Sequence, residues 1–379
     1  MSLDYIEEGA ETLELEPDSV KAACRAIDRE IEAGIAPGAV LAVVYRGREW
    51  MYTTGYANPE HRMHVHEDTL YDCASLTKVV VTLPLVLSLI DEGILSLGTT
   101  ISSWLPEFGA AGKEEVTVGQ LLTHTSGLQA DMNLHSHGWS MERMWEAINQ
   151  VALQREPQTA VVYSDLGYLI LGRLVEEVLG MPIDEAARIR IFEPLGMKST
   201  AFSPILDSKS RCAATEYDDE FGGHLCGVVH DEKARALGGA CGHAGLFASA
   251  GDLARYARMW QEGGQVPDDS STPSGSAQYQ RILSRAAVGM SIQSHTIGIP
   301  DANRGLGWVL KGDRMDASGD WMSTRSYGHT GFTGTSLWID PDHDLAVVLL
   351  TNRVYGGRSG SVASLRARVH NALTAAVRT

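Results

Sequence analysis

The most constraining feature of the sequence is an apolar run over residues 79–90, in which apolar and polar residues do not alternate. A run of this length without a period of two favours a buried helix over a strand. The run is preceded directly by residues 72–78, which contain Ser75 and Lys78. If the helix begins near Ser75, the two side chains lie one turn apart on the same face.

This spacing suggests a chemical role for the serine. A serine hydroxyl becomes a useful nucleophile only when a base lies within hydrogen-bond reach. Lys78 could be that base, or could polarise another one, if burial lowers its pKa below the free value of about 10.4. The alternative is an N-cap serine followed by a lysine whose stem lies along apolar surface. We favour the nucleophile because this is the only Ser-x-x-Lys in the chain and two further motifs follow it.

Composition excludes several classes of function. The 379 residues are 44% hydrophobic and 21% charged, which allows a large core or two domains. The net charge of −17, without a basic stripe, argues against a nucleic-acid partner. No stretch of about twenty apolar residues occurs, so we predict no membrane span. Cys-x-x-Cys and His-Glu-x-x-His are both missing, and His61, His64 and His66 lie in a polar stretch, so we predict no metal and no other cofactor.

The N-terminal residues and the cysteines bear on localisation. The chain starts Met-Ser-Leu-Asp and continues with acidic positions, unlike a secretory signal peptide. Its five cysteines are an odd number without paired spacing, which favours reduced thiols. We therefore expect the chain as given to be cytoplasmic, and exported if a signal peptide has been removed. The oligomeric state and the roles of His243 and of the loop over residues 263–276, which reads as exposed and mobile, stay open.

The order of elements predicts the architecture. Strands are expected over residues 38–45, 49–56, 305–310, 326–329, 334–340 and 345–351. Helices are expected over residues 18–33, 75–92, 140–153, 164–179, 251–261, 282–290 and 359–377, with a further one from Pro182. Strands thus gather at both ends of the chain and helices in the middle. We predict an α/β domain from residues 1–85 and 285–379, an inserted helical domain from residues 86–284, and an active site between them.

Two later segments contain candidate site residues. Tyr163 directly precedes a helix that Ser164 or Asp165 would cap, so it is either a packing residue or a phenolic base. Residues 327–334 contain glycines in a strand pattern, which often mark a close approach of backbone to a ligand. His329 in this segment is either a structural histidine or a substrate contact. Free backbone N–H groups here and at Ser75 would suit an oxyanion hole.

Together these motifs resemble those of the penicillin-recognising serine hydrolases, which include class C β-lactamases, D,D-peptidases and related esterases. Residues 75–78 resemble the family's Ser-x-x-Lys, residues 163–165 its Tyr-x-Asn, and residues 329–331 its Lys-Thr-Gly, of which His-Thr-Gly is a known variant. Residues 121–128 and 193–197 are similar to family segments that carry no chemistry. The resemblance covers nearly the whole chain and implies a β-lactamase/transpeptidase-like fold.

The resemblance also implies roles for individual residues. Ser75 would be acylated, Lys78 and Tyr163 would share its proton, and the N–H groups of Ser75 and Phe332 would form the oxyanion hole. His329 would face the anionic end of the substrate. The residues that contact the substrate would be Asp165, His329, Thr330 and Gly331.

Two departures from the family pattern argue against efficient β-lactamase action. Asp165 replaces an amide, and an ionised carboxylate cannot donate a hydrogen bond. His329 replaces a permanent cation. The combination of Asp165 and His329 with residues 242–247 resembles the pattern of a subgroup that acts on cell-wall muropeptides, such as exo-acting muramyl amidases.

We therefore expect a serine hydrolase that acts through an acyl-enzyme on an ester, amide or peptide bond of a small molecule or muropeptide. The first alternative is a true β-lactamase or D,D-carboxypeptidase. The second belongs to another class of function: a penicillin-binding or sensing module that does not turn over a substrate.

Overall fold

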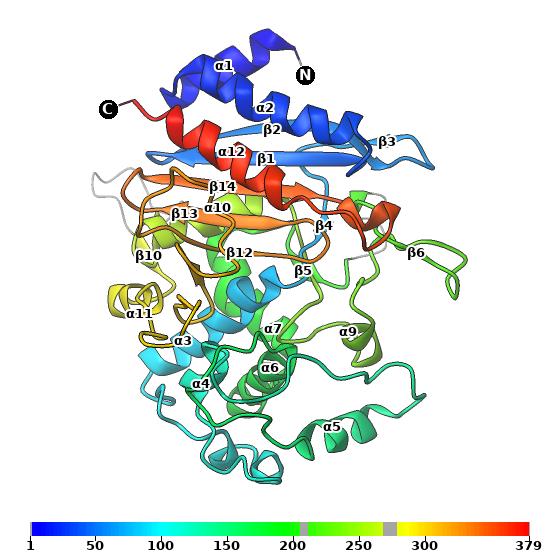
Figure 1. The fold of residues 1–379 in the computed structure, drawn as a ribbon, viewed down its shortest axis with the longest axis vertical. Helices are drawn as coiled ribbons and strands as arrows, with labels where there is room; N and C mark the ends of the chain where they lie inside the picture. Colours follow the sequence, from blue (N-terminus) through cyan, green and yellow to red (C-terminus); the bar gives the residue numbers. More distant parts are fainter. Residues whose placement is uncertain (1, 205–210, 268–278, 379) are drawn as a thin grey trace.

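A large antiparallel sheet forms the centre of the protein (Figure 1). The computed structural model describes residues 2–204, 211–267 and 279–378. Within these ranges the sheet has seven strands in the order β11-β12-β13-β14-β1-β2-β3. Their bounds are β1 Gly38–Tyr45, β2 Arg48–Asn58, β3 Met63–His64, β11 Val309–Leu310, β12 Tyr327–Thr330, β13 Ser336–Asp340 and β14 Leu345–Thr351. β1 pairs with β14, with Val43 opposite Val347, so the two ends of the chain build one sheet, as predicted.

Helices cover both faces of this sheet. All positions of β1 are buried, which explains its continuous apolar sequence. Leu41 and Val43 face an outer core, and Val40 and Ala42 face an inner one, as alternation along a strand requires. The outer face carries α1 Leu3–Leu13, α2 Pro17–Glu32 and α12 Ala363–Ala375 (Figure 1). α10 Ala250–Gln261 packs against the inner face, at β1 and β14.

Most of the remaining helices lie on the inner side of the sheet (Figure 1). They are α3 Leu83–Asp91, α4 Val118–Leu122, α5 Met141–Asn149, α6 Asp165–Leu179, α7 Ile183–Ala187, α8 Glu193–Leu195, α9 Glu232–Ala236 and α11 Arg285–Ser291. β4 Tyr71–Asp72, β8 Leu246–Ala248 and β5 Ala201–Phe202 form a separate three-stranded sheet in the order β4-β8-β5. α10 falls inside the predicted helical domain but packs on the sheet, so the division into domains stays a prediction.

The helix after Ser75 runs without a break from Leu76 to Asp91, close to the single helix predicted, but part of it is π-helical. After a turn at Ala74 and Ser75, two α-helical residues lead into the π-helical segment Lys78–Thr82, which continues directly into α3. Pro84 has no N–H with which to continue the α-helical ladder, and the N–H of Leu83 bonds to the carbonyl of Lys78, five residues back. The wider turn leaves backbone groups to be satisfied from outside, and the Tyr256 hydroxyl donates to the carbonyl of Val79.

Other differences are local. Of residues 305–310 only Val309–Leu310 form a strand. The first part of the predicted loop over residues 263–276 includes β9 Gln265–Pro267, which pairs with β10 Tyr279–Arg281, while residues 268–276 lie outside the described residues. In the ranges that the structure covers, no helix combines the length and apolar character needed to cross a membrane.

Asn352 follows β14 directly and bonds to the start of β1 and the end of β2, which gives a prediction about stability. It is buried, accepts from the N–H of Gly38 at 3.0 Å and donates to the carbonyl of Ala57 at 3.0 Å. Asn352→Ala should lower the free energy of unfolding by about 1–3 kcal/mol, because the N–H of Gly38 loses its acceptor inside the protein. Urea unfolding measures this. Asn133→Ala, at an exposed site, should change it by less than about 0.5 kcal/mol, and equal effects would contradict the assignment.

Candidate active site

Ser75 stands on a strained turn between β4 and the π-helical segment. The preceding residue, Ala74, has a φ of 45°, which is rare for a residue with a side chain. Its N–H donates to Asp72 Oδ1 at 2.8 Å, and Asp72 is itself buried. The hydrogen bond to Asp72 therefore fixes the turn, and Ser75 lines a cavity of about 650 Å³.

Lys78 is fully buried and contacts the serine. Its Nζ donates to Ser75 Oγ at 2.9 Å and to the carbonyl of His243 at 3.1 Å, and lies 2.8 Å from Asp165 Oδ1. Burial alone lowers the pKa of Lys78, but the charge of Asp165 and the contact with Tyr163 outweigh burial and raise it above its ordinary value. A lowered pKa, the condition for Lys78 itself to be the base, is therefore not met, because the carboxylate of Asp165 lies in the same pocket. Lys78 rests as an ammonium.

Tyr163 completes the predicted catalytic group. It lines the cavity just before α6, where the Ser164 hydroxyl accepts from the N–H of Gly167 at 3.2 Å and caps the helix. Lys78 Nζ lies 5.0 Å from the centre of the Tyr163 ring. The structure thus brings Ser75, Lys78 and Tyr163 together, while their roles stay predictions.

His124 positions Tyr163, although the sequence gave its segment no chemical part. Its Nδ1 accepts from the backbone N–H of Ser164 at 3.1 Å, and its ring packs 4.6 Å from the ring of Tyr163. The His124 side chain is buried, and the backbone of His124 has a positive φ of 59°. An unusual backbone conformation next to a cavity is a mark of a functional position, but it is visible only in three dimensions.

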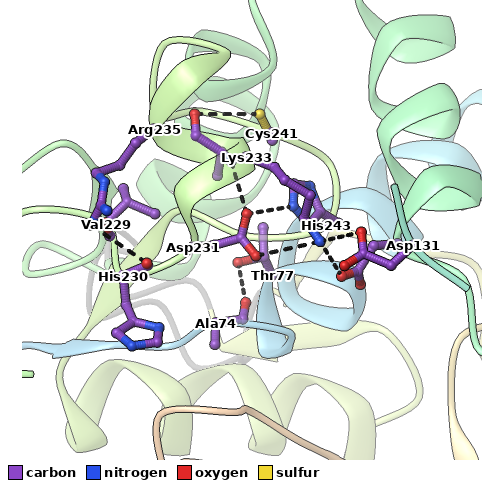
Figure 2. A network of polar contacts seen from close by, with 12 residues as sticks. Ala74, Thr77, Asp131, Val229, His230, Asp231, Lys233, Arg235, Cys241 and His243 are labelled. Carbon is purple, nitrogen blue, oxygen red and sulfur yellow. Dashed lines mark hydrogen bonds and ion pairs between the residues drawn. The ribbon is translucent and has the colours of Figure 1, made fainter. Parts of the chain in front are cut away.

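A second lysine, missed by the sequence analysis, lies beside Asp131 and Asp231 (Figure 2). Lys233 Nζ on α9 lies 2.5 Å from Asp131, 3.1 Å from Asp165 and 3.8 Å from Asp231. Burial would raise the pKa of Asp165, but Lys78, His243 and Lys233 together hold it well below its usual range. Asp165 therefore remains ionised and bridges two ammonium groups. Only the fold brings Lys233 here, since no motif marks it.

Ligand atoms of Asp165, Asp231 and His243 lie within 4.8 Å of one another, the spacing of a metal site. His243 Nε2 already contacts Asp231 Oδ1 at 3.1 Å. The Lys233 ammonium pairs with both carboxylates and would repel a metal cation at the same place. The residues therefore fit a metal poorly, and that no metal takes part stays a prediction.

His329 is fully buried on β12. Its Nδ1 lies 2.8 Å from the carbonyl of Thr330, and its ring is 5.8 Å from that of Tyr163. Burial, together with the positive charges of Lys78 and Arg304, lowers the pKa of His329 to about 3. The imidazole is thus neutral over the physiological range. The contact of His329 with an anionic substrate stays a prediction. A neutral His329 would bring no positive charge to that contact.

The residues after His329 line the cavity and are tied to the Ser75 turn. The hydroxyls of Thr333 and Thr335 donate to the carbonyls of Asp72 and Cys73, at 2.6 Å and 3.1 Å. A Cβ at Gly331 would lie 2.4 Å from the Cys73 carbonyl oxygen, so only glycine fits this approach. Two segments distant in sequence, residues 72–73 and 331–335, are thereby held side by side.

Two backbone N–H groups are free to bind an oxyanion. Those of Ser75 and Phe332 donate to no acceptor in the described part of the chain, and both residues line the cavity. Thr330 and Gly331, predicted to contact the substrate, line it as well. Both donors are therefore available, and their role as an oxyanion hole stays a prediction.

Comparisons with known proteins agree with this arrangement. The family model described as Beta-lactamase matches residues 25–372. A protein of Salmonella gallinarum named "Putative D-alanyl-D-alanine carboxypeptidase" is 30% identical over 368 residues, covering 86% of this chain and 81% of that protein. A solved hydrolase with promiscuous acyltransferase activity has a TM-score of 0.74 at 22% identity, covering 94% of this chain and 98% of that one. A class C beta lactamase from Rhodobacter sphaeroides has a TM-score of 0.70 at 23% identity, over 93% and 98%. The predicted fold is confirmed.

The buried neutral state of His329 predicts a pH dependence of stability. In the unfolded chain its pKa is about 6.5, so between that value and about 3 the unfolded state binds more protons and stability falls as the pH falls. His329→Gln should reduce the loss between pH 7 and pH 4 by up to about 3 kcal/mol. Urea unfolding at several pH values measures it. His135→Gln, at an exposed site, should keep the native slope, and an unchanged slope in His329→Gln would refute the assignment.

Proposed function

Because the chain belongs to the beta-lactamase family and is a serine hydrolase, we propose that it cleaves an ester, amide or peptide bond through an acyl-enzyme on Ser75. The observation that carries this proposal is the 2.9 Å contact between Lys78 Nζ and Ser75 Oγ on the wall of a cavity. The hydroxyl is thereby oriented beside a charged group and two free backbone donors.

In the first step, Ser75 Oγ attacks the carbonyl carbon of the substrate. Lys78 is charged at rest and cannot accept a proton, which leaves the phenolate form of Tyr163 as the acceptor. The ammonium of Lys78 stabilises the negative charge on the phenolic oxygen, and Asp165 holds that ammonium in place. The proton then passes from Tyr163 to the leaving group as the carbon–oxygen or carbon–nitrogen bond breaks.

The N–H groups of Ser75 and Phe332 would stabilise the negative charge that develops on the carbonyl oxygen. In the second step water attacks the acyl carbon and gives a proton to Tyr163, and Tyr163 passes that proton to Ser75 Oγ as the bond between Oγ and the acyl carbon breaks and the acid product leaves. The charged groups Lys78 and Asp165 are already in place at rest, so they reorganise little during the reaction.

We propose substrates from cell-wall-derived muropeptides or small esters. A second candidate activity is D,D-carboxypeptidase, because a relative that is 30% identical over most of both chains carries that name. An open cavity of about 650 Å³ accommodates either class. We further propose that the sheet domain and the inserted helical domain, as divided above, supply opposite walls of the site.

Ser75→Ala should abolish ester turnover and covalent labelling by a fluorophosphonate, because no other hydroxyl occupies its place on the turn. Intact-protein mass spectrometry and hydrolysis of a p-nitrophenyl ester measure the two effects. Thermal unfolding should stay near the native value, and Ser136→Ala, at an exposed site, should label normally. Retained labelling of Ser75→Ala would refute the nucleophile. A single labelling burst without turnover in the native protein would favour a binding or sensing module.

Lys78 and Tyr163 should act as one unit. Lys78→Ala and Tyr163→Phe should each lower the acylation rate by about 10²-fold or more, and the double variant should be little worse than the poorer single one. Stopped-flow measurement of the acylation phase tests this. Lys198→Ala, at an exposed site, should leave the rate unchanged. If the two losses multiply instead, the residues act independently, and the proposed coupling between the Lys78 ammonium and the Tyr163 oxygen is wrong.

A further inference from the structure

Arg304 is a buried arginine whose guanidinium lies over the ring of Tyr163. It precedes β11, only 1% of the residue is exposed, and its Cζ is 5.9 Å from the centre of that ring. Its Nε donates to Asp313 Oδ2 at 3.1 Å, and its Nη2 donates to the sulfur of Met315 at 2.8 Å. Its Nη1 has no hydrogen-bond partner in the described part of the chain. The guanidinium is therefore only partly satisfied by the groups around it.

Two fixed cations adjoin the ring of Tyr163. Lys78 Nζ lies 5.0 Å from the centre of the ring, and Arg304 is the second cation. Each is held by one carboxylate, Lys78 by Asp165 and Arg304 by Asp313. Burial lowers the pKa of Arg304, while Asp313 and Tyr163 oppose the lowering, and an arginine keeps its proton at physiological pH. Both positive charges are therefore present at rest.

The other titratable side chains that face Tyr163 are neutral. The rings of His124 and His329 lie 4.6 Å and 5.8 Å from that of Tyr163. Burial, together with the charges of the two cations, lowers the pKa of both histidines. Burial also raises the pKa of Tyr168, whose hydroxyl donates to a backbone carbonyl at 3.1 Å. These neighbours add no charge, and the electrostatic environment of Tyr163 is set by the two ion pairs.

The ion pair between Arg304 and Asp313 places its two charges differently. The carboxylate of Asp313 accepts from the backbone N–H groups of Asn303 and Met315, at 2.9 Å and 2.8 Å, within its own loop. The guanidinium of Arg304 instead lies over the ring of Tyr163, and its charge also acts on the neighbouring histidines. The guanidinium is thus the end of the pair that contacts Tyr163.

A cation beside an aromatic ring interacts more strongly with a phenolate than with a neutral phenol, because the phenolate carries a full negative charge. We propose that Arg304 acts through Tyr163, and that its guanidinium stabilises the phenolate that accepts the proton of Ser75. This inference rests on the proposed function, because it concerns the proton acceptor of the same site. Arg304 does not line the cavity, so it is a positioning residue and does not contact the substrate.

The pH profile of ester hydrolysis tests this role. Since Tyr163 accepts a proton only as the phenolate, kcat/KM for the neutral ester phenyl acetate should rise with pH along an acid limb whose midpoint reports this ionisation. Arg304→Gln removes a positive charge and disfavours the phenolate, so it should raise the midpoint by about one pH unit or more. Arg304→Lys keeps the charge and should restore most of the native position.

Asp313→Asn should have the opposite effect. It leaves the charge of Arg304 without its counter-ion, favours the phenolate and should lower the midpoint of the acid limb. A purely structural ion pair predicts no such difference in sign, because both variants break the same contact. Midpoints that move in the same direction in Arg304→Gln and Asp313→Asn, or that move in neither, would overturn the inference.

Two further variants exclude a folding defect and a general effect of charge. If Arg304→Gln does not fold, because Asp313 is left buried and unpaired, the double variant Arg304→Gln/Asp313→Asn is compared with Asp313→Asn. Its midpoint should be higher by about one unit or more, and an equal midpoint would overturn the inference. Arg325→Gln is the matched control, because Arg325 is exposed and pairs with Asp342 at 2.8 Å. It should keep the native midpoint, and a shift equal to that of Arg304→Gln would also overturn the inference.

A titration without substrate separates this inference from the proposed function. The chain has 12 tyrosines, so the tyrosinate absorbance of Tyr163→Phe is subtracted from that of the native protein to isolate the ionisation of Tyr163. The same subtraction in the Arg304→Gln background should place this ionisation about one pH unit or more higher. That result supports the inference even if Ser75→Ala retains ester turnover, which would refute only the nucleophile. An unchanged ionisation would overturn the inference and leave the role of Ser75 unaffected.

Discussion

The ion pair between Lys78 and Asp165 is the interaction on which the site depends. An ammonium that is completely buried is tolerated only when a carboxylate and hydrogen-bond acceptors surround it. Asp165 begins α6, and the carbonyl of His243 lies beside β8, so two distant segments converge on one nitrogen atom. That nitrogen in turn orients Ser75. The pair therefore couples the packing of the inner helices directly to the position of the nucleophile.

Asp165 forms ion pairs with two lysines, so its carboxylate acts within the protein and not as a donor to the substrate. In the family motif an amide stands here and donates to the substrate, whereas an ionised carboxylate only accepts. Lys233 contacts Asp165 on the side away from Lys78 and connects it to Asp131 and Asp231. Charge is thus balanced within the wall of the cavity. The substitution is compensated by a network rather than by one neighbouring residue.

The second constraint is the contact between the third motif and the Ser75 turn. Gly331 passes so close to Cys73 that any Cβ would collide with its carbonyl, and Thr333 and Thr335 bond to the same turn. The two free N–H groups proposed as the oxyanion hole are held at a fixed separation by these contacts. The pairing of β1 with β14 supports the arrangement, because it joins the two ends of the chain that carry the first and third motifs.

The sequence by itself determined the sheet from both chain ends and the helices between them, because strand alternation and helix caps are local patterns. The grouping of Ser75, Lys78 and Tyr163 came from the resemblance of their motifs to those of a known family. The sequence did not determine the pKa of Lys78, since that depends on a carboxylate 87 residues away in sequence. Lys233 and Arg304 carry no local signal either, and their burial and their contacts with Asp165 and Tyr163 arise only when distant elements pack. Tertiary structure decided these points because charge interactions depend on distance in space and on the exclusion of water.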